Sequence, residues 1–412
     1  MASSTKRVVI TGFGGVSSLG HDWPSIAAAL KNQQNAVVHM TDWHKYAGLN
    51  TRLAAPVTDF EKPAHYSRKK VRSMGRVSLM ATYASEQALI SAGLLDDPVV
   101  TSGDMGIAYG SSTGSTDPII AFGDMLKHGD MSGVTATSYI RMMAHTTAVN
   151  VGVYFGLKGR VHTTSSACTS GSQGIGYAYE AIKYGQQKLM LAGGGEELCA
   201  TEAVVFDTLF ATSTRNDDPH GTPRPFDKDR DGLVIGEGAC TLVLEELSHA
   251  QARGAHIYAE IVGFGTNSDG LHVTQPHAET MEVAIRHAIA DADIEPQQIG
   301  YVNAHGTATD RGDIAESHAT HAVFGSKVPI SSLKSYTGHT LGACGALEAW
   351  VSVEMMNEGW FAPTLNLQQL DPECATLDYI REDIRRIDTD YVMSNNFAFG
   401  GINTSLIFKK WK

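Results

Sequence analysis

Short apolar, β-branched runs alternate along the chain with longer stretches in which apolar residues recur at helical spacing. In the first half this pattern predicts strands at Lys6–Thr11, Met105–Gly110 and Leu189–Ala192, and helices at Trp23–Leu30 and Ser78–Ala92. The glycine-rich segment 12–15 is expected to turn the chain after the first strand, because glycine tolerates positive φ, and the third strand is expected to end in the three glycines at 193–195. Strands and helices in alternation predict an α/β fold.

The second half restarts the same pattern. Residues 257–265 resemble residues 8–15, residues 280–292 form a predicted helix like the one at 78–92, and residues 299–305 form a predicted strand. This repeat indicates an internal duplication with a break near residue 250. The chain there has the character of a helix end and not of a flexible linker, so the two halves are expected to pack together.

Composition narrows the class of protein. The 412 residues are 42% hydrophobic and 18% charged, which is typical of a large globular chain, and the net charge of −12 disfavours nucleic acid as a partner. There is no apolar run long enough for a bilayer and no signal-peptide core at the N-terminus, so we expect no membrane as a partner and no secretion. The five cysteines are scattered without CxxC spacing, which favours free thiols in the cytoplasm.

Cys168 lies in a run of small residues that leads into a predicted helix at Thr169–Tyr184. Gly171, Gly174 and Gly176 would let this helix pack closely. A thiol at a helix N-terminus has a lowered pKa, and its own backbone N–H can supply half of an oxyanion hole. Cys168 is therefore a candidate nucleophile, although a buried structural cysteine is the commoner case. The other cysteines, at positions 199, 240, 344 and 374, are interpreted as structural.

Two histidines stand in Gly-rich turns of the second half, His305 after a predicted strand and His339 before a predicted helix at Leu341–Met355. Two neutral imidazoles can donate hydrogen bonds to one carbonyl oxygen and stabilise an enolate as it forms. Lys334 and Glu348 are expected to orient and charge-balance them. A lysine near the thiol would also favour the thiolate.

No metal site is expected. His318 and His321 would share a helix face but have no third ligand at a suitable spacing. Residues 227–232 imitate the start of a calcium loop, yet position 238, where the final carboxylate is required, is a glycine. We interpret that segment as a turn with local salt bridges.

Taken in order, the motifs of the chain resemble those of the elongating (type I/II) β-ketoacyl-acyl-carrier-protein synthases, condensing enzymes of the thiolase superfamily. The resemblance runs nearly end to end. Its motifs are Val-Val-Ile-Thr-Gly-Phe-Gly at 8–14, Ser-Arg-Lys at 67–69, Ala-Cys-Thr-Ser-Gly at 167–171, Ser-Thr-Arg-Asn-Asp at 213–217, Arg-Pro-Phe-Asp-x-x-Arg-Asp-Gly at 224–232, Asn-Ala-His-Gly-Thr at 303–307, Lys-Ser-x-Thr-Gly-His at 334–339, Gly-Ala-x-Gly-Ala-x-Glu at 342–348 and Asn-x-Phe-x-Phe-Gly-Gly-x-Asn at 395–403.

The resemblance implies a duplicated, thiolase-like, five-layered αβαβα fold. Residues 1–250 would form the half with the nucleophile, and residues 251–412 the half with the histidine pair. A homodimer that works with acyl- and malonyl-loaded acyl carrier protein is also implied. No cofactor is expected, because the phosphopantetheine arrives on the carrier protein.

Residue roles follow from the same resemblance. Cys168 would take the acyl chain, and His305 and His339 would hold the malonyl thioester and promote its decarboxylation, supported by the lysine and glutamate named above. Phe399 would gate the acyl pocket, and its backbone N–H would complete the oxyanion hole. The residues expected to contact substrate or pantetheine are Thr307, Thr309, Phe206 and Thr274.

Carrier docking is expected at Arg68 and Lys69, in a basic stretch that contrasts with the acidic background. Carrier proteins are acidic, so such a patch would speed association, with a strong salt dependence. A solvated helix face is the alternative interpretation of the same residues.

The histidine pair separates the superfamily members. A degradative thiolase acting on coenzyme A would carry a second catalytic cysteine, and an initiating synthase pairs His with Asn. A non-catalytic, chain-length-factor-like partner subunit would lack Cys168. Ser112 and Thr113 in expected pocket positions and Ala398 in the gating loop depart from the familiar pattern, and they suggest an unsaturated or aryl-capped chain, as in polyene pathways.

Overall fold

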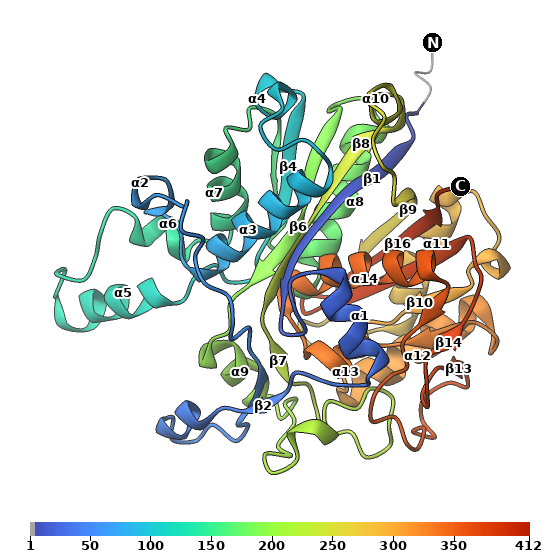
Figure 1. Cartoon of the computed structure of the whole chain (residues 1–412). Helices are drawn as coiled ribbons and strands as arrows, with labels where there is room; N and C mark the ends of the chain where they lie inside the picture. Colours follow the sequence, from blue (N-terminus) through green and yellow to red (C-terminus); the bar gives the residue numbers. More distant parts are fainter. Residues whose placement is uncertain (1–4) are drawn as a thin grey trace.

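The computed structural model of the chain describes residues 5–412 (Figure 1). Residues 1–4 lie outside the described part, and they belong to the N-terminal segment in which no secretion signal is predicted. Eleven strands of the described part form one sheet in the order β13-β11-β10-β15-β16-β9-β1-β8-β6-β4-β5. Their bounds are β1 Val8–Ser17, β4 Met105–Gly110, β5 Val161–Thr163, β6 Leu189–Glu196, β8 Gly238–Glu246, β9 Ala259–Ser268, β10 Tyr301–Asn303, β11 Pro329–Ser331, β13 Asp378–Tyr379, β15 Tyr391–Ala398 and β16 Ile402–Lys410.

The sheet consists of two strand groups with the same internal order. β5-β4-β6-β8-β1 corresponds to β11-β10-β15-β16-β9, and β13 extends the second group. β4 pairs in parallel with β5 and β6, as β10 does with β11 and β15, whereas β8 and β16 run antiparallel to their neighbours. The groups join where β1 pairs antiparallel with β9, with Val8 opposite Ile261. This repeat agrees with the predicted duplication.

Helices form three layers around the two strand groups. α3 (Arg76–Ser91) and α7 (Thr146–Phe155) cover the outer face of the first group, and α11 (Ala278–Ala292), with α12 (Asp310–Phe324) beside it, covers that of the second. α8 (Ser170–Lys183) and α14 (Cys344–Glu358) contact strands of both groups and lie in the centre (Figure 1). The predicted five-layered αβαβα arrangement is therefore present.

Successive strand residues face different cores, as the period of two requires. Ile107 of β4 belongs to an apolar cluster with the inner face of α3, whereas its neighbour Ala108 packs with Ile175 of α8. A third cluster lies between the second strand group and the helices α11 and α12. The central helices are buried on nearly all sides and can hold polar side chains away from water.

The predicted turn after the first strand is wrong, because residues 12–15 continue as strand in β1, and β6 likewise runs through the glycines at 193–195 to Glu196. Gly14 lies in β1 where a Cβ would collide with the carbonyl oxygen of Ala84 in α3. Gly265 of β9 meets Ala284 of α11 in the same way. Glycine here permits close contact between helix and sheet, a tertiary requirement that local turn preferences do not express.

The remaining elements are short. The other helices are α1 Trp23–Lys31, α2 Arg68–Val71, α4 Pro98–Ser102, α5 Asp117–His128, α6 Ser138–Met142, α9 Ala200–Asp207, α10 Leu247–Ala252 and α13 Lys334–Thr337, and the small strands are β2 Val38–His39, β3 Leu53–Ala55, β7 Ile235–Gly236, β12 Trp360–Phe361 and β14 Arg385–Arg386. The predicted boundary after residue 250 falls inside α10, and the division into halves there stays a prediction. Within residues 5–412, every helix is too short or too polar to cross a membrane.

Candidate active site

The candidate nucleophile sits on a tight turn. Cys168 belongs to a 3-10 turn, Ala167–Thr169, that leads directly into α8, and it is 4% exposed. Ala167 has a φ of 52°, a left-handed conformation that is uncommon for a residue with a Cβ. Gly171 lets this turn approach the one before α14, because an added Cβ would lie 2.9 Å from the carbonyl oxygen of Gly342. Close packing of small residues thus brings the cysteine and histidine turns together.

His339 comes from the loop between α13 and α14. Its Nε2 lies 3.0 Å from Sγ of Cys168. Its Nδ1 accepts the backbone N–H of Leu341 at 3.3 Å, so the proton of the neutral ring resides on Nε2. His339 therefore donates toward the sulfur and toward a group bound beside it.

His305 follows β10 by two residues. Its ring stands nearly perpendicular to that of His339, at 88°, with the ring centroids 5.2 Å apart. One nitrogen of each ring and the sulfur of Cys168 lie within 4.8 Å of one another. The structure thus brings the three residues singled out in the sequence to one point.

Two sets of side chains bear on the expectation that no metal is bound. His318 and His321 do not converge on a common point, since they hydrogen-bond to the backbone carbonyls of Glu373 and Thr376 at 2.9 and 3.0 Å. The thiol and the two imidazoles of the site are close enough together to ligate an ion. Operation without a metal therefore stays a prediction.

A buried ion pair lies behind the histidines. Lys334 Nζ is 2.5 Å from Oε1 of Glu348, and the two side chains are 1% and 5% exposed. The other carboxylate oxygen accepts from Nδ2 of Asn396 at 2.7 Å, and the same Nδ2 lies 3.4 Å from Nδ1 of His305. Burial opposes a charge on the lysine, but Glu348, together with Cys344 and Glu316, outweighs burial and raises the pKa of Lys334. The lysine is therefore a fixed positive charge beside the site.

Burial sets the protonation of all three reactive side chains. It lowers the pKa of His305 and of His339 well below the usual value, and Lys334 lowers both further, so both rings are neutral near pH 7. The expected lowering for the nucleophile is wrong: burial raises the pKa of the Cys168 thiol to about 11, although Lys334 and the backbone N–H groups of Phe399 and Cys168 act against it. Desolvation wins because the thiol is enclosed. The candidate nucleophile is therefore a thiol and not a thiolate at rest.

A cavity of about 520 Å³ reaches Cys168 from the surface. Its wall contains both histidines, Phe399 and the four predicted contact residues, Thr307, Thr309, Phe206 and Thr274. The rings of Phe206 and Phe399 lie 5.0 Å apart next to the thiol. The backbone N–H groups of Cys168 and Phe399 both reach the sulfur, so this pair of donors can serve an oxyanion. Lys334 and Glu348 lie behind the wall.

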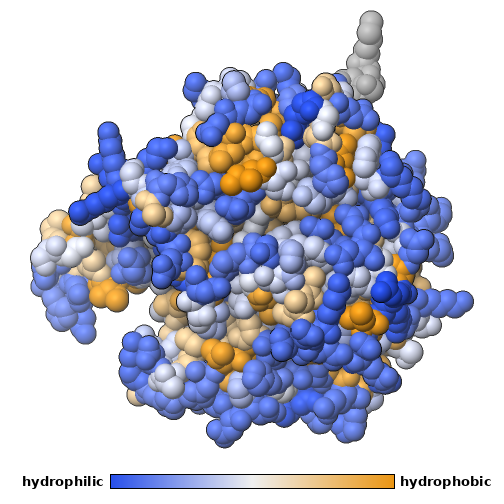
Figure 2. All heavy atoms as spheres, viewed as in Figure 1, coloured by the Kyte–Doolittle hydropathy of each residue, from blue (hydrophilic) through white to orange (hydrophobic). Residues whose placement is uncertain are grey.

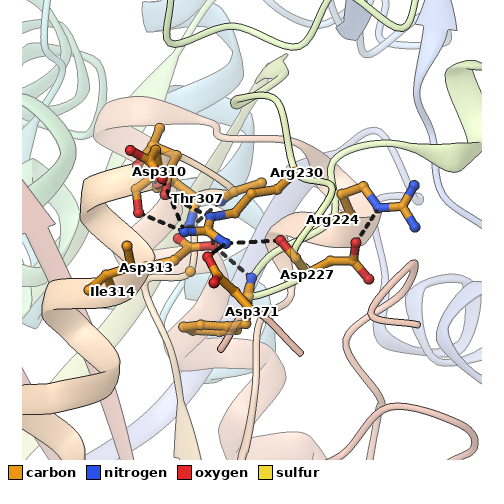
Figure 3. Close-up of polar contacts among 12 residues, drawn as sticks. Arg224, Asp227, Arg230, Thr307, Asp310, Asp313, Ile314 and Asp371 are labelled. Atoms are coloured by element: carbon orange, nitrogen blue, oxygen red, sulfur yellow. Dashed lines mark hydrogen bonds and ion pairs between the residues drawn. The ribbon is translucent and has the colours of Figure 1, made fainter. Parts of the chain in front are cut away.

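A buried arginine holds the loop that carries Thr307 and Thr309 (Figure 3). Arg230 pairs with Asp371 at 2.5 Å and with Asp313 at 3.7 Å, and its Nε donates to the carbonyl oxygen of Thr309 at 3.2 Å. Asp313 in turn accepts the backbone N–H of Thr307 at 3.0 Å. Burial raises the pKa of Asp313 to about 6 against the pull of the arginine. The network fixes one wall of the cavity.

The sequence predicted only part of the ion-pair network that holds this wall. The local pair Arg224–Asp227, at 3.1 Å, agrees with the predicted turn with salt bridges. The long-range ion pairs of Arg230 with Asp313 and Asp371 were not predicted, because the local sequence around Arg230 does not indicate which distant residues it contacts. Glu316 was missed as well: it accepts the backbone N–H groups of His305 and Gly306, each at 2.7 Å, and burial raises its pKa to about 8. Its only signal was an acidic residue in the helix after the His-Gly-Thr motif.

Several predicted features lie away from the cavity. Arg68 and Lys69 are exposed in α2, well apart from α9 at the cavity (Figure 1). The hydroxyl groups of Ser112 and Thr113 donate to buried Glu196, at 2.5 and 3.2 Å. The two hydroxyl groups are thus engaged with a carboxylate, so they lend no support to an unusual acyl chain.

The methyl group of Ala398 causes no strain in the gating loop. Ala398 is the last residue of β15, opposite Ile402, in strand conformation. The left-handed positions of the turn are the two glycines that follow Phe399, with φ of 88° for Gly400 and 68° for Gly401. The departure from the familiar pattern at Ala398 therefore does not by itself indicate a changed gating loop.

Comparisons with known proteins agree with this geometry. The family model described as the N-terminal domain of beta-ketoacyl synthase matches residues 5–250, and that of the C-terminal domain matches residues 258–368. A 3-oxoacyl-[acyl-carrier-protein] synthase 2 of Vibrio harveyi is 38% identical over 415 residues, which cover 99% of both chains. A crystal structure of a beta-ketoacyl synthase from Burkholderia phymatum STM815 shares 64% identity at a TM-score of 0.98, over 99% of this chain and 100% of that one.

A more distant solved structure shows a related protein with a partner. It is a type II polyketide ketosynthase in complex with its acyl-carrier protein, 29% identical at a TM-score of 0.87, over 99% of this chain and 100% of that one. Together these similarities confirm the predicted thiolase-like fold and the predicted class of enzyme, a condensing acyltransferase. They do not favour the chain-length-factor alternative. The chain belongs to the β-ketoacyl synthase family.

Proposed function

We propose that the chain condenses an acyl group held on Cys168 with the malonyl group of malonyl-acyl-carrier protein, in the elongation of a fatty acid or a related polyene or polyketide. The observation that carries this proposal is the triangle of one thiol and two neutral imidazoles within 4.8 Å. A degradative thiolase would need a second reactive thiol. Cys344 does not fill that role, because its Sγ donates to the carbonyl oxygen of Cys168 at 3.3 Å and its side chain does not line the cavity.

Acyl transfer to the enzyme comes first. The sulfur of Cys168 attacks the carbonyl carbon of the acyl thioester, the bond to the pantetheine sulfur breaks, and the proton of Cys168 ends on the departing thiol. Because a pKa of about 11 keeps the resting thiol protonated, the proton leaves as the sulfur attacks. The backbone N–H groups of Cys168 and Phe399 stabilise the charge on the carbonyl oxygen, and Lys334 favours negative charge on the sulfur.

Condensation uses the histidines as paired donors. Nδ1 of His305 faces the amide of Asn396, which Glu348 holds as a donor, so the ring proton of His305 lies on Nε2, as it does in His339. Both Nε2–H groups donate to the malonyl thioester oxygen. When CO2 leaves, the electron pair of the bond to the malonyl α-carbon stays with that group and forms an enolate, whose oxygen the two histidines stabilise. The α-carbon of the enolate then attacks the carbonyl carbon of the acyl group on Cys168. The bond to Cys168 breaks, and the sulfur takes a proton from solvent.

The expected cofactor, partner and location belong to the same proposal. No resident cofactor is needed, because the phosphopantetheine arm enters with the carrier protein and passes Thr307 and Thr309. Acyl carrier protein is the proposed partner, in line with the name of the Vibrio harveyi relative and with the solved ketosynthase complex, and Arg68 and Lys69 would assist its docking. The five free thiols fit a cytoplasmic location.

A homodimer is the proposed working state. The projecting helix α5 leaves Ile120 and Leu126 72% and 82% exposed, and Figure 2 shows hydrophobic surface on that projection. Large exposed apolar side chains of this kind favour a protein contact. Sedimentation of the purified chain would measure its mass in solution, and a monomer at micromolar concentration would contradict this part of the proposal.

Product formation tests the proposed reaction. The purified chain is incubated with hexanoyl- and malonyl-acyl-carrier protein, and the β-ketoacyl product is measured by mass spectrometry. Cys168→Ala is expected to abolish the product, and iodoacetamide modification of Cys168 should do the same. A Cys168→Ala variant that condenses at the normal rate would refute the proposal, and a partner subunit without activity of its own would show no product with the unmodified chain.

A further inference from the structure

A buried carboxylate outside the group of Cys168 and the two histidines joins the end of one strand to two turns. Glu196 is the last residue of β6 and is 0% exposed. Its Oε2 accepts the backbone N–H of Ser112 at 2.7 Å and that of Gly342 at 3.0 Å. Its Oε1 accepts the hydroxyl groups of Ser111 at 2.8 Å and of Thr113 at 3.2 Å. One side chain thus binds both the turn after β4 and the turn before α14.

The turn before α14 is strained and contacts His339. Leu341 has a φ of 45°, a left-handed conformation that a bulky residue rarely adopts. Its N–H donates to Nδ1 of His339 at 3.3 Å, and this contact places the ring proton on Nε2. The N–H of the next residue, Gly342, donates to Glu196. Because a strained backbone persists only where its surroundings hold it, Glu196 keeps Leu341 where its N–H can fix the ring of His339.

Close packing leaves the Gly342 turn little freedom around this contact. A Cβ added to Gly342 would lie 2.8 Å from Oε2 of Glu196 and 3.0 Å from Cα of Ser111. A Cβ added to Gly194 of β6 would collide with the carbonyl oxygen of Gly342. The turn is therefore clamped against the ends of β6 and β4, and the carboxylate supplies the acceptor that its N–H needs there.

The duplication gives Gly342 a counterpart in the first half. The 3-10 turns Ala167–Thr169 and Leu341–Ala343 each lead into a central helix, and each begins with a residue of positive φ. Cys168 and Gly342 are thus equivalent second positions of the two turns. The N–H of Cys168 can serve the oxyanion of a substrate, whereas the equivalent N–H of Gly342 binds the resident carboxylate of Glu196. The second turn is built as a support and not as a reaction centre.

We propose that Glu196 is a positioning residue for condensation, which holds the Leu341–Gly342 turn and thereby keeps Nε2–H of His339 directed at the malonyl thioester. This inference rests on the proposed function. The cavity wall, as the described residues form it, does not include Glu196, so the carboxylate acts through His339 and not on the substrate. Loss of this support would slow the decarboxylation and condensation that need both histidines. Acyl transfer to Cys168, which uses the backbone donors, would continue.

Two substitutions separate the reach of the side chain from its charge. Glu196→Asp keeps the carboxylate but withdraws it from Gly342 by one methylene group. Glu196→Gln keeps the length, and its amide can turn the carbonyl oxygen to Gly342 and the NH2 group to the hydroxyl groups of Ser111 and Thr113, which can accept.

Condensation is measured with hexanoyl- and malonyl-acyl-carrier protein, and acyl transfer by the mass of the hexanoylated chain. Glu196→Asp is expected to lower kcat for condensation about tenfold, because displacement of a reacting group by about 1 Å can slow a reaction about a hundredfold. The charge of Glu196, which adds to burial in raising the pKa of Cys168, is kept in Glu196→Asp, so acyl transfer should proceed at its normal rate. Glu196→Gln should retain most of the kcat for condensation.

Glu197→Asp is the matched control, one residue further along the chain. Glu197 is also buried, and it accepts the N–H groups of Val77 and Thr116 at 3.0 and 2.9 Å and the hydroxyl group of Ser115 at 2.7 Å. None of these donors belongs to the turn that contacts His339. Shortening Glu197 should therefore lower the stability in urea, as shortening Glu196 does, but leave kcat unchanged.

A double variant tests whether the effect passes through His339. In a His339→Ala background, Glu196→Asp should cause no further loss of kcat, because the side chain that it positions is gone. Circular dichroism checks that each variant is folded. A further tenfold loss in this background would assign Glu196 to the stability of the whole site and would overturn the inference.

The other contrary results are equally distinct. Normal condensation by Glu196→Asp would show that the Gly342 turn needs no such support. A large loss of kcat in Glu196→Gln would by itself show that charge and not reach is required, and loss of acyl transfer in step with condensation would show an effect on Cys168; each of these results overturns the inference. Failure of the unmodified chain to form the β-ketoacyl product would instead count against the proposed function.

Discussion

The protonation of Cys168 allows a direct test of how this site is built. Burial raises the pKa of the thiol from an ordinary 9.0 to about 11, a shift of two units that corresponds to about 2.7 kcal/mol. At pH 8 the thiolate fraction is then about one in a thousand, against about one in ten for an ordinary thiol. Because the pKa is shifted upward, the thiolate of Cys168 becomes populated only as the pH approaches the pKa of about 11 in the folded protein.

The rate of alkylation by iodoacetamide, followed by mass spectrometry of the Cys168 peptide, measures how the thiolate fraction of Cys168 depends on pH. The rate should rise about tenfold per pH unit from about pH 7 to about pH 10 without a plateau. The slope is the decisive quantity, because burial also slows access of the reagent at every pH. Cys199, only half-buried, is alkylated in the same sample and monitors the reagent.

Lys334→Met supplies the matched perturbation. The side chain keeps its length but loses the charge that lowers the pKa of Cys168, so alkylation should be slower throughout and the plateau should move to still higher pH. Circular dichroism checks that the variant is folded. A plateau below about pH 9 in the unmodified chain would refute the reasoning, because the cation and the backbone donors would then outweigh desolvation.

Three further outcomes are expected. Lys334→Met should lower the free energy of unfolding by about 3–5 kcal/mol, because Glu348 loses its buried partner. Adding Glu348→Leu should restore most of this free energy. Urea denaturation measures the stability of both variants, and equal stability of the single and double variants would contradict the ion-pair argument. His339→Ala should slow condensation about 10²–10³-fold while acyl transfer to the nucleophile, followed by radiolabelled acyl groups, persists; loss of acylation as well would show a wider role. Gly14→Ala should destabilise the fold by about 1–3 kcal/mol through overpacking against α3, whereas Gly123→Ala, in open space on α5, should stabilise it by up to about 1 kcal/mol. Thermal denaturation measures the stability of both variants. Similar stability of the two variants would contradict the close contact between Gly14 and α3.

The sequence was informative where function depends on local order. The small-residue turn at Cys168 and the Gly-rich turns at His305 and His339 marked these residues as candidates before the fold was known, because turns at strand and helix ends present side chains to a cleft. The resemblance to the condensing enzymes supplied the roles proposed for them. The repeated strand and helix pattern also showed the duplication. It failed at the glycines of β1 and β6, whose role is set by a helix or strand distant in sequence and not by their neighbours in the chain.

The sequence alone identified the side chains that are proposed to carry the chemistry, and it fixed their order along the chain. Tertiary structure decided their state: the enclosure of Cys168 keeps its thiol protonated, and the burial of both histidines keeps them neutral. It also decided the ion pairs of Arg230 and the exposure of Phe210 in the cavity wall. The physical reason is that desolvation, ion pairing and exposure depend on every segment that surrounds a group in space, whereas a sequence pattern reports only the neighbours along the chain.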